Sequence, residues 1–268
     1  MAAETATVDL VMIGGGNMGS ALLGGLLAAG RVSPADVAVV ELDSARRDDL
    51  AVQFPGVLIT DTVPPCAAAV LAVKPAGIPD TARVAVAAGA RRVLSIAAGV
   101  TTATIRAVVG DGVDVVRSMP NTPAMVGQGV TAICVDAHSD PAALDWAEHV
   151  LSAVGMVVRV DESHFDAVTG LTGSGPAYVF AIAESLIAAG RSVGLPAELL
   201  EPMVTQLLVG SSTLLAERGD PEALRVAVTS PGGTTAAGLG VLAAGDLNGL
   251  VADAVRAATE RGRELGQA

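Results

Sequence analysis

The chain has 268 residues, of which 51% are hydrophobic and 2% aromatic, and its formal net charge is −12. This hydrophobicity excludes a disordered chain, and 28 acidic against 16 basic residues make nucleic acid a poor partner, because binding it requires clustered cations. The mean hydropathy of +0.56 is high, but no uncharged apolar run reaches the roughly 18–20 residues that span a bilayer. We therefore expect no membrane segment, and we expect the apolar surface to be buried within the chain or between chains.

The cysteine content and the N-terminus bear on the cellular compartment. Cys66 and Cys134 are the only cysteines, and two isolated thiols favour a reducing compartment over a disulfide framework. The opening MAAETATVDL lacks the basic stretch and apolar core of a signal peptide, so we expect a cytoplasmic protein. The three histidines are scattered without the spacing of metal ligands, and no metal site is predicted.

The first half of the chain alternates short apolar runs with segments of helical length. Continuous apolar strands with such connections are typical of a parallel sheet that is covered on both faces, which predicts an α/β fold. The last two strands are candidates for antiparallel additions at one edge. The predicted strands are Val8–Ile13, Asp36–Val40, Val57–Thr60, Ala68–Val73, Arg92–Ile96, Asp114–Arg117, Val130–Val135 and Met156–Val160.

The second half is predicted to be helical throughout. An apolar helix is expected over Ala177–Ala189 and a longer one over Ala197–Glu217, where apolar residues follow helical spacing. Asp220, followed by a proline, is an N-cap acceptor before a first-turn proline and starts a third helix. A fourth follows the segment SPGGTT, and Asp246 starts the last one.

The motif GGGNMG fits the pattern G-x-G-x-x-G and lies between a predicted strand and a predicted helix. Gly14 permits the tight turn, Gly16 lets the backbone approach a pyrophosphate, and Gly19 allows the helix to pack closely on the strand. The N–H groups at the helix start attract phosphate groups. A tight turn without a ligand is the alternative, but the βαβ context favours dinucleotide binding.

The residues beyond the second strand leave the type of nicotinamide cofactor open. Glu41 and Asp43 lie about 20 residues past the last glycine, where an acidic side chain binds the ribose 2′-hydroxyl and favours NAD. Arg46 and Arg47 follow, and an arginine at this place can hold the 2′-phosphate of NADP. An ordinary solvated loop and helix start is the third interpretation of all four residues.

Three further motifs lie just past predicted strands, where open α/β sheets bind ligands. AVKP contains Lys74, the only lysine, AAGV leads to the candidate helix cap Thr101, and MPNTPA has two prolines that fix an extended loop around Asn121. Each has a structural alternative, such as a solvated ammonium or an asparagine that satisfies local backbone groups. Their convergence at one sheet edge favours a ligand site.

Two motifs mark the helical half. GSGPAY is mainly a helix start, with its proline in the first turn. SPGGTT exposes backbone N–H groups at two glycines and adds three hydroxyls just before a helix, which suits a small carboxylate. A turn with threonine caps is the alternative there. The sequence offers no obvious general acid or nucleophile.

In this order and spacing, GGGNMG, AVKP, AAGV, MPNTPA, GSGPAYVF and SPGGTT resemble the pyrroline-5-carboxylate reductase family over nearly the whole chain. The last two motifs are far more specific than the glycine-rich loop. The resemblance implies a Rossmann-type dinucleotide-binding domain, placed at residues 1–161, and an all-helical dimerisation and substrate domain at residues 162–268. It implies a homodimer, often assembled into a decamer of five dimers. The implied reaction is hydride transfer from NADPH or NADH to the C=N bond of 1-pyrroline-5-carboxylate, which gives L-proline, the last step of proline biosynthesis.

The resemblance also implies roles for individual residues, and Thr235 is the catalytic candidate because its hydroxyl would lie near the ring nitrogen. A cyclic imine that is protonated in solution is already electrophilic, which fits the missing general acid. The segment GDPEAL is shorter than in many members; Glu217 or Asp220 could fill the missing acidic place, and neither is assigned a role. The implied cofactor-binding residues are Gly14, Gly16, Asn17, Met18, Gly19, Ala72, Val73, Lys74, Pro75 and Asn121, and the implied substrate-binding residues are Ser230, Gly232, Gly233, Thr234 and Thr235.

Two other functions remain open. One is another imine or β-hydroxyacid reductase of the same build, although a hydroxyacid enzyme is expected to use a lysine on its helical domain and Lys74 lies in the first domain. The other is a non-catalytic dinucleotide-binding sensor, against which the intact SPGGTT and Asn121 loops argue. The helix over Ala177–Ala189 is apolar nearly all round, and we expect a partner chain to bury it.

Overall fold

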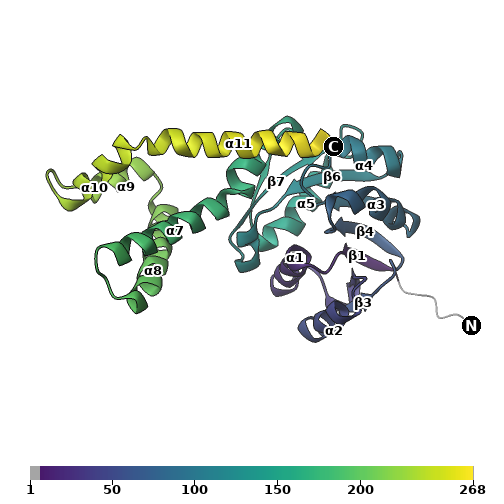
Figure 1. Cartoon of the computed structure of the whole chain (residues 1–268). Helices are drawn as coiled ribbons and strands as arrows, with labels where there is room; N and C mark the ends of the chain where they lie inside the picture. The colour runs from purple at the N-terminus through teal and green to yellow at the C-terminus, as the bar shows by residue number, and fades with distance from the viewer. Residues whose placement is uncertain (1–6, 268) are drawn as a thin grey trace, which may run out of the picture. The chain divides into compact units, whose positions relative to one another are not determined.

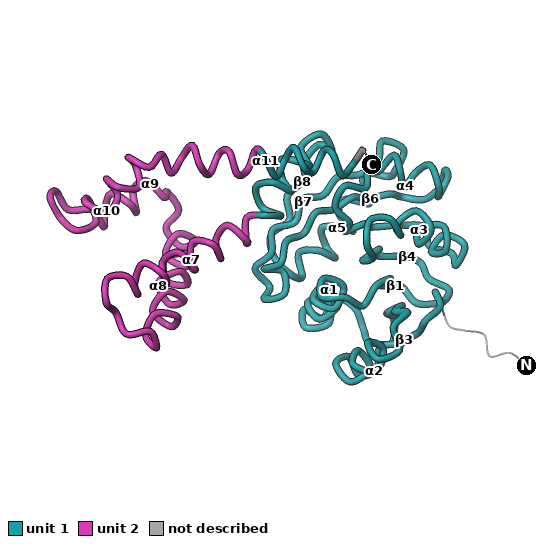
Figure 2. Tube along the Cα trace, in the orientation of Figure 1, with its two compact units in different colours: residues 1–174, 257–268 teal, residues 175–256 magenta. Residues whose placement is uncertain are grey.

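The computed structural model describes residues 7–267, which form two compact units (Figures 1 and 2). The first unit comprises the chain up to Ser174 together with the segment from Ala257 onward, and the second comprises Gly175–Arg256. These units divide the chain at other positions than the expected domain boundary between residues 161 and 162, which stays a prediction.

The first unit is built on an eight-stranded sheet in the order β3-β2-β1-β4-β5-β6-β7-β8. Neighbours from β3 to β6 pair in parallel, β7 runs antiparallel to β6, and β8 is parallel to β7. Both the parallel α/β fold and the antiparallel pair at one edge are therefore confirmed. The strands are β1 Val8–Ile13, β2 Val37–Val40, β3 Leu58–Thr60, β4 Cys66–Leu71, β5 Arg92–Ser95, β6 Asp114–Met119, β7 Gly129–Val135 and β8 Gly155–Arg159.

Helices cover both faces of this sheet (Figure 1). The central strands therefore bury apolar side chains on both faces, in one core on each side of the sheet. One face packs under α1 (Asn17–Ala28), α2 (Ser44–Gln53) and α5 (Ala142–Leu151). The other packs under α3 (Ile78–Ala87) and α4 (Thr102–Val109). A short helix, α6 (Phe165–Val168), buries Phe165 against β7.

The strand order fixes where a ligand can bind. The chain proceeds from β1 outward through β2 and β3, then returns to the other side of β1 with β4. The connections after β1 and β4 therefore leave toward opposite sides, and a crevice opens at the carboxyl ends of the strands. The glycine-rich turn follows β1 and the AVKP segment follows β4, so both predicted motifs lie at this crevice.

The second unit is helical, as predicted. The expected caps are present: the Asp220 carboxylate accepts from Ala223 N (3.0 Å), and Asp246 accepts from Gly249 N (3.2 Å). Leu200 packs so closely on Gly190 that a Cβ there would lie 2.4 Å from its Cδ2. The helices are α7 Gly175–Ser192, α8 Ala197–Arg218, α9 Pro221–Ala227, α10 Thr234–Ala244 and α11 Leu247–Gln267, the last of which ends in the first unit.

Large apolar side chains of these helices are exposed in the single chain. Phe180 on α7 is 62% exposed and Val241 on α10 is 73% exposed. By length and composition, among the residues described, α8 could cross a membrane, as could the bent pair of α10 and α11. A helix that is buried against another protein chain meets the same criterion.

Candidate functional site

The turn between β1 and α1 has the backbone geometry that its glycines predict. Gly14 adopts φ +110°, and a Cβ there would lie 2.5 Å from the Ala72 carbonyl oxygen. A Cβ on Gly19 would lie 2.2 Å from the Gly14 carbonyl oxygen, so this residue lets α1 pack on the turn. Gly16 is the N-cap of α1 and a Cβ there would meet nothing within 4 Å. The open space beside Gly16 gives a ligand access to the helix start.

This turn borders a pocket of about 920 Å³ at the carboxyl ends of β1 to β4. The pocket contains predicted residues from two motifs, Gly14 and Gly16 on one side and Lys74 on the other. Its walls are largely apolar, which suits a flat aromatic ring system. The lining residues are Ile13, Gly14, Gly16, Val40, Glu41, Leu42, Asp61, Thr62, Val63, Ala72, Val73, Lys74, Asp80, Thr81 and Val84.

The remaining predicted cofactor residues flank the pocket lining. Asn17 and Met18 open α1 beside Gly16, and Met18 packs against the apolar core with part of its side chain. Pro75 starts the short 3₁₀ turn Pro75–Gly77 that ends the AVKP segment. These residues shape the backbone around the pocket rather than forming its surface.

The Asn121 side chain stabilises its loop through hydrogen bonds to backbone groups. Its Oδ1 accepts from Val130 N (2.8 Å), and its Nδ2 donates to the Thr172 carbonyl oxygen (3.0 Å). Thr172 lies in a π-helical segment, Thr169–Gly173, just before α7. The structural alternative for Asn121 is therefore realised, and its contact with a cofactor stays a prediction.

The SPGGTT segment forms a turn at the N-terminus of α10. Gly232 adopts φ +69°, and Gly233 is the N-cap, donating its N–H to the Ser230 carbonyl oxygen (3.0 Å). Thr234 and Thr235 are the first residues of the helix, so the free N–H groups and hydroxyls gather at one helix end. This turn belongs to the second unit, and the pocket beside Gly14 and Gly16 belongs to the first.

Residues 162–265 match the family of pyrroline-5-carboxylate reductase dimerisation domains, and residues 9–99 match the family described as NADP oxidoreductase, coenzyme F420-dependent. A pyrroline-5-carboxylate reductase of Synechocystis sp. is 39% identical over 97% of this chain and 99% of the relative. One of Mycobacterium tuberculosis is also 39% identical, over 96% of both chains. The chain belongs to the pyrroline-5-carboxylate reductase family. The predicted family is confirmed.

Solved structures of pyrroline-5-carboxylate reductases agree with this assignment. The reductase from Coxiella burnetii superposes with a TM-score of 0.89 at 34% identity, covering 97% of this chain and 99% of that one. The Plasmodium falciparum reductase, solved with NADP bound, superposes with a TM-score of 0.82 at 27% identity, covering 97% and 98%. The two-part architecture of a Rossmann-type domain and a helical region is therefore that of the reductase family.

Several residues that line the pocket beside the β1–α1 turn were not predicted from the sequence. Asp61, Thr62 and Val63 follow β3, and Asp80 and Val84 lie on α3. The first group could have been found by applying the strand-end rule to the third strand as well, since that strand was predicted correctly over Val57–Thr60. The α3 residues face the pocket only because the helix packs on the sheet, and no motif marks them.

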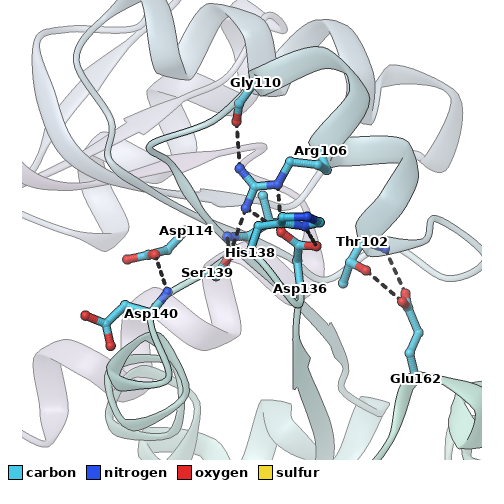
Figure 3. A network of polar contacts seen from close by, with 10 residues as sticks. Thr102, Arg106, Gly110, Asp114, Asp136, His138, Ser139, Asp140 and Glu162 are labelled. Carbon is cyan, nitrogen blue, oxygen red and sulfur yellow. Dashed lines mark hydrogen bonds and ion pairs between the residues drawn. The ribbon is translucent and has the colours of Figure 1, made fainter.

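A polar network near the start of the dimerisation-domain match was also missed (Figure 3). The Glu162 carboxylate accepts from both Thr102 N and Thr102 Oγ1 at 2.7 Å, at the N-terminus of α4. It also pairs with Arg117 (3.1 Å), whose buried guanidinium lies 4.4 Å from the centre of the Phe165 ring. Glu162 thus links the start of α4, after β5, to the segment that leads into α6.

The Cys134 thiol lies near this network. Burial, with the nearby Glu162 charge, raises the pKa of the Cys134 thiol to about 12, so this thiol is no nucleophile.

A second part of the network joins α4 to the loop after β7. Arg106 Nε donates to Asp136 Oδ2 (2.7 Å), and its Nη2 donates to Ser139 Oγ (2.9 Å). Burial opposes ionisation of Asp136, but hydrogen bonds from Arg106 and His138 outweigh it and hold the pKa of that carboxyl below its usual value of 3.8. Both parts of the network brace the sheet edge next to the antiparallel strands.

Proposed function

We propose that this chain reduces 1-pyrroline-5-carboxylate to L-proline with a reduced nicotinamide cofactor, as the last step of proline biosynthesis. The observation that carries the proposal is family membership over nearly the full length, at 39% identity to reductases of two organisms. The dinucleotide-binding turn and the SPGGTT turn are both intact, which argues against a sensor that has lost turnover.

The first unit is the cofactor-binding part in this proposal. The helix start at Gly16 and Asn17 would bind the pyrophosphate, because a Cβ on Gly16 would meet nothing within 4 Å and the N-terminus of a helix carries partial positive charge. Ala72 to Lys74 would line the other side, and the loop held by Asn121 is a further cofactor contact that the family resemblance implies. The bound cofactor would supply the hydride for the C=N carbon, and the residues of the chain would orient the cofactor toward the substrate.

The SPGGTT turn is the substrate-binding part. Backbone N–H groups of Gly232 and Thr234, with the Ser230 hydroxyl, would bind the substrate carboxylate at the positive end of α10, and Gly233, whose N–H donates to the Ser230 carbonyl oxygen, would hold the turn in shape. The Thr235 hydroxyl would orient the ring nitrogen of the imine and assist its protonation. No stronger acid is required, because a protonated cyclic imine already accepts a hydride.

The exposed apolar helices of the second unit support a homo-oligomer. We propose a homodimer in which α7 and its neighbours are buried against the partner, with a decamer of five dimers as the larger assembly that the family resemblance implies. The match to a dimerisation domain over residues 162–265 supports this. We further propose a cytoplasmic enzyme that binds neither membranes nor nucleic acid, in keeping with its formal charge of −12.

The decisive assay mixes the purified full chain with 1-pyrroline-5-carboxylate and either NADH or NADPH and follows oxidation of the cofactor. Turnover with at least one cofactor is expected, and none with either would refute the proposal. A panel of other cyclic imines and β-hydroxyacids tests the alternative substrates. Faster turnover of any of them would replace the proposed substrate.

The role of Thr235 is tested by Thr235→Val, which keeps the shape of the side chain and removes its hydroxyl. We expect kcat/KM to fall on the order of tenfold or more, as for a lost polar contact in the transition state. Thr104→Val makes the same change on the exposed surface of α4 and should leave kcat/KM unchanged. Equal kinetics of the Thr235 variant and the wild type would remove Thr235 from the mechanism.

A further inference from the structure

Glu41 is the first residue after β2, and its carboxylate lines the dinucleotide pocket. Its Oε2 accepts from Gly15 N (2.9 Å), and its Oε1 accepts from Leu42 N (2.8 Å) and Asp43 N (3.1 Å). A carboxylate offers about four lone-pair sites, so three are filled and one remains on Oε2. The side chain is therefore fixed in the pocket wall with one acceptor site free.

The same contacts remove the donors that a phosphate group would need at this place. The N–H groups of Gly15, Leu42 and Asp43, which follow β1 and β2, all donate to the Glu41 carboxylate. An anion bound there would have to displace a charge-assisted set of hydrogen bonds.

The two arginines after β2 donate hydrogen bonds to protein oxygens outside the pocket lining or to the backbone beside it. Arg46 Nε donates to the Gly15 carbonyl oxygen (2.9 Å), and its Nη2 donates to Ser20 Oγ (2.8 Å). Arg47 Nη1 donates to the carbonyl oxygens of Glu41 and Leu42, each at 2.9 Å. Neither arginine lines the pocket. Both brace the backbone that carries Glu41.

The other charged residues that line the pocket would not stabilise a phosphate near Glu41, because two are acidic and the third, Lys74, follows a more distant strand. Asp61 and Asp80 line the pocket together with Glu41, so three carboxylates face one ammonium, that of Lys74. Lys74 follows β4, which is separated from β2 by β1, so the two strand ends lie roughly 10 Å apart. The exposed apolar surfaces of Leu42 and Val84, which also line the pocket, leave room for an adenine ring between these groups.

We infer that the chain prefers NADH over NADPH, with Glu41 as the residue that sets this specificity. The free acceptor site of its carboxylate takes a hydroxyl of the adenosine ribose, and its charge repels the 2′-phosphate of NADPH. The inference rests on the cofactor-binding part of the proposed function. Because the Plasmodium relative was solved with NADP, family membership alone does not decide this point.

The test measures binding without the imine substrate, by isothermal titration calorimetry of the full chain with NADH and with NADPH. We expect NADH to bind at least about tenfold more tightly, which equals about 1.4 kcal/mol. Glu41→Ala should lower this ratio at least about tenfold, by weakening NADH and relieving the repulsion of NADPH. The matched control Asp48→Ala removes an exposed carboxylate on α2 outside the pocket and should keep the wild-type ratio.

A wild-type ratio below about ten, or an unchanged ratio in Glu41→Ala, overturns the inference. If that variant does not fold, competition in the wild type decides instead: 5′-AMP should displace NADH at lower concentration than adenosine 2′,5′-bisphosphate. Equal or stronger displacement by the bisphosphate overturns the inference. Preferential NADH binding without turnover of 1-pyrroline-5-carboxylate would refute only the proposed reaction, and turnover that favours NADPH would refute only the Glu41 inference.

Discussion

Alanine substitutions in the β1–α1 turn should separate folding from cofactor binding, because the surroundings of its glycines differ. A Cβ on Gly19 would lie 2.2 Å from the Gly14 carbonyl oxygen, and a backbone atom cannot move aside as a flexible side chain can. A Cβ on Gly16 would meet nothing within 4 Å, although Gly16 lines the pocket. Gly19→Ala therefore perturbs the fold, and Gly16→Ala perturbs the space for the ligand.

The two substitutions should differ in stability by a measurable amount. Forcing a methyl group into a closely packed contact costs about 1–3 kcal/mol, which we expect for Gly19→Ala. At Gly16 the backbone angles, φ −68° and ψ −175°, suit alanine. Restricting the unfolded chain there gains about 0.4–1 kcal/mol, which offsets the similar preference for glycine over alanine at an N-cap. The stability of Gly16→Ala should therefore lie within about 1 kcal/mol of wild type.

The binding affinities should change differently from the stabilities. We expect Gly16→Ala to weaken NADH about tenfold to a hundredfold, since its methyl group stands where a pyrophosphate would accept charge-assisted hydrogen bonds. Chemical denaturation measures the stability of each variant, and calorimetric titration measures its affinity. Wild-type affinity in Gly16→Ala would refute the assigned pyrophosphate site, and wild-type stability in Gly19→Ala would refute the packing argument.

Two further predictions concern the polar network. Glu162→Ala leaves the buried Arg117 without its carboxylate partner and should lower the free energy of unfolding by about 2–4 kcal/mol, measured by denaturation. The control is Asp161→Ala at the exposed neighbouring position, and an equal effect there would contradict the stabilising role of the Glu162–Arg117 pair. The pKa of Asp136 is lower in the folded chain than its usual 3.8, so its stabilising effect is complete above that value and is lost as the pH falls through the folded pKa. Asp136→Asn should therefore flatten the loss of stability between about pH 5 and pH 2, and an unchanged acid limb of the stability curve would show that Asp136 does not contribute to it.

The features that the sequence predicts well are those that depend on neighbours along the chain. The strand–turn–helix around GGGNMG follows from an apolar run, glycines at fixed spacing and a helix directly after them. The caps at Thr101, Asp220 and Asp246 are equally local, since each side chain accepts from an N–H three residues ahead. The eight predicted strands rest on the same kind of evidence, and the structure confirms them to within a few residues.

Polar contacts between distant segments lack such a local signal. Glu162 binds Thr102 across 60 positions of the chain, and Arg106 binds Asp136 across 30. Neither pair follows a period or a motif, because what brings them together is the packing of α4 beside the last strands. Asn121 shows the same limit: its prolines predict a rigid loop, but its partner Thr172 is set by the path of the chain 51 residues later.

The four charged residues after β2 show why local patterns left the cofactor type undecided. Two of them are acidic and two are basic, and each kind has a known role beside a ribose or a phosphate. Only the tertiary contacts distinguish them: Arg46 reaches the Gly15 carbonyl oxygen 31 residues away, and Glu41 reaches Gly15 N across 26. Both guanidinium groups donate to backbone carbonyl oxygens and neither lines the pocket, whereas the Glu41 carboxylate lines it and keeps a free acceptor site. The hydrogen bonds that these side chains already make, rather than the number of charges, favour a ribose hydroxyl beside Glu41.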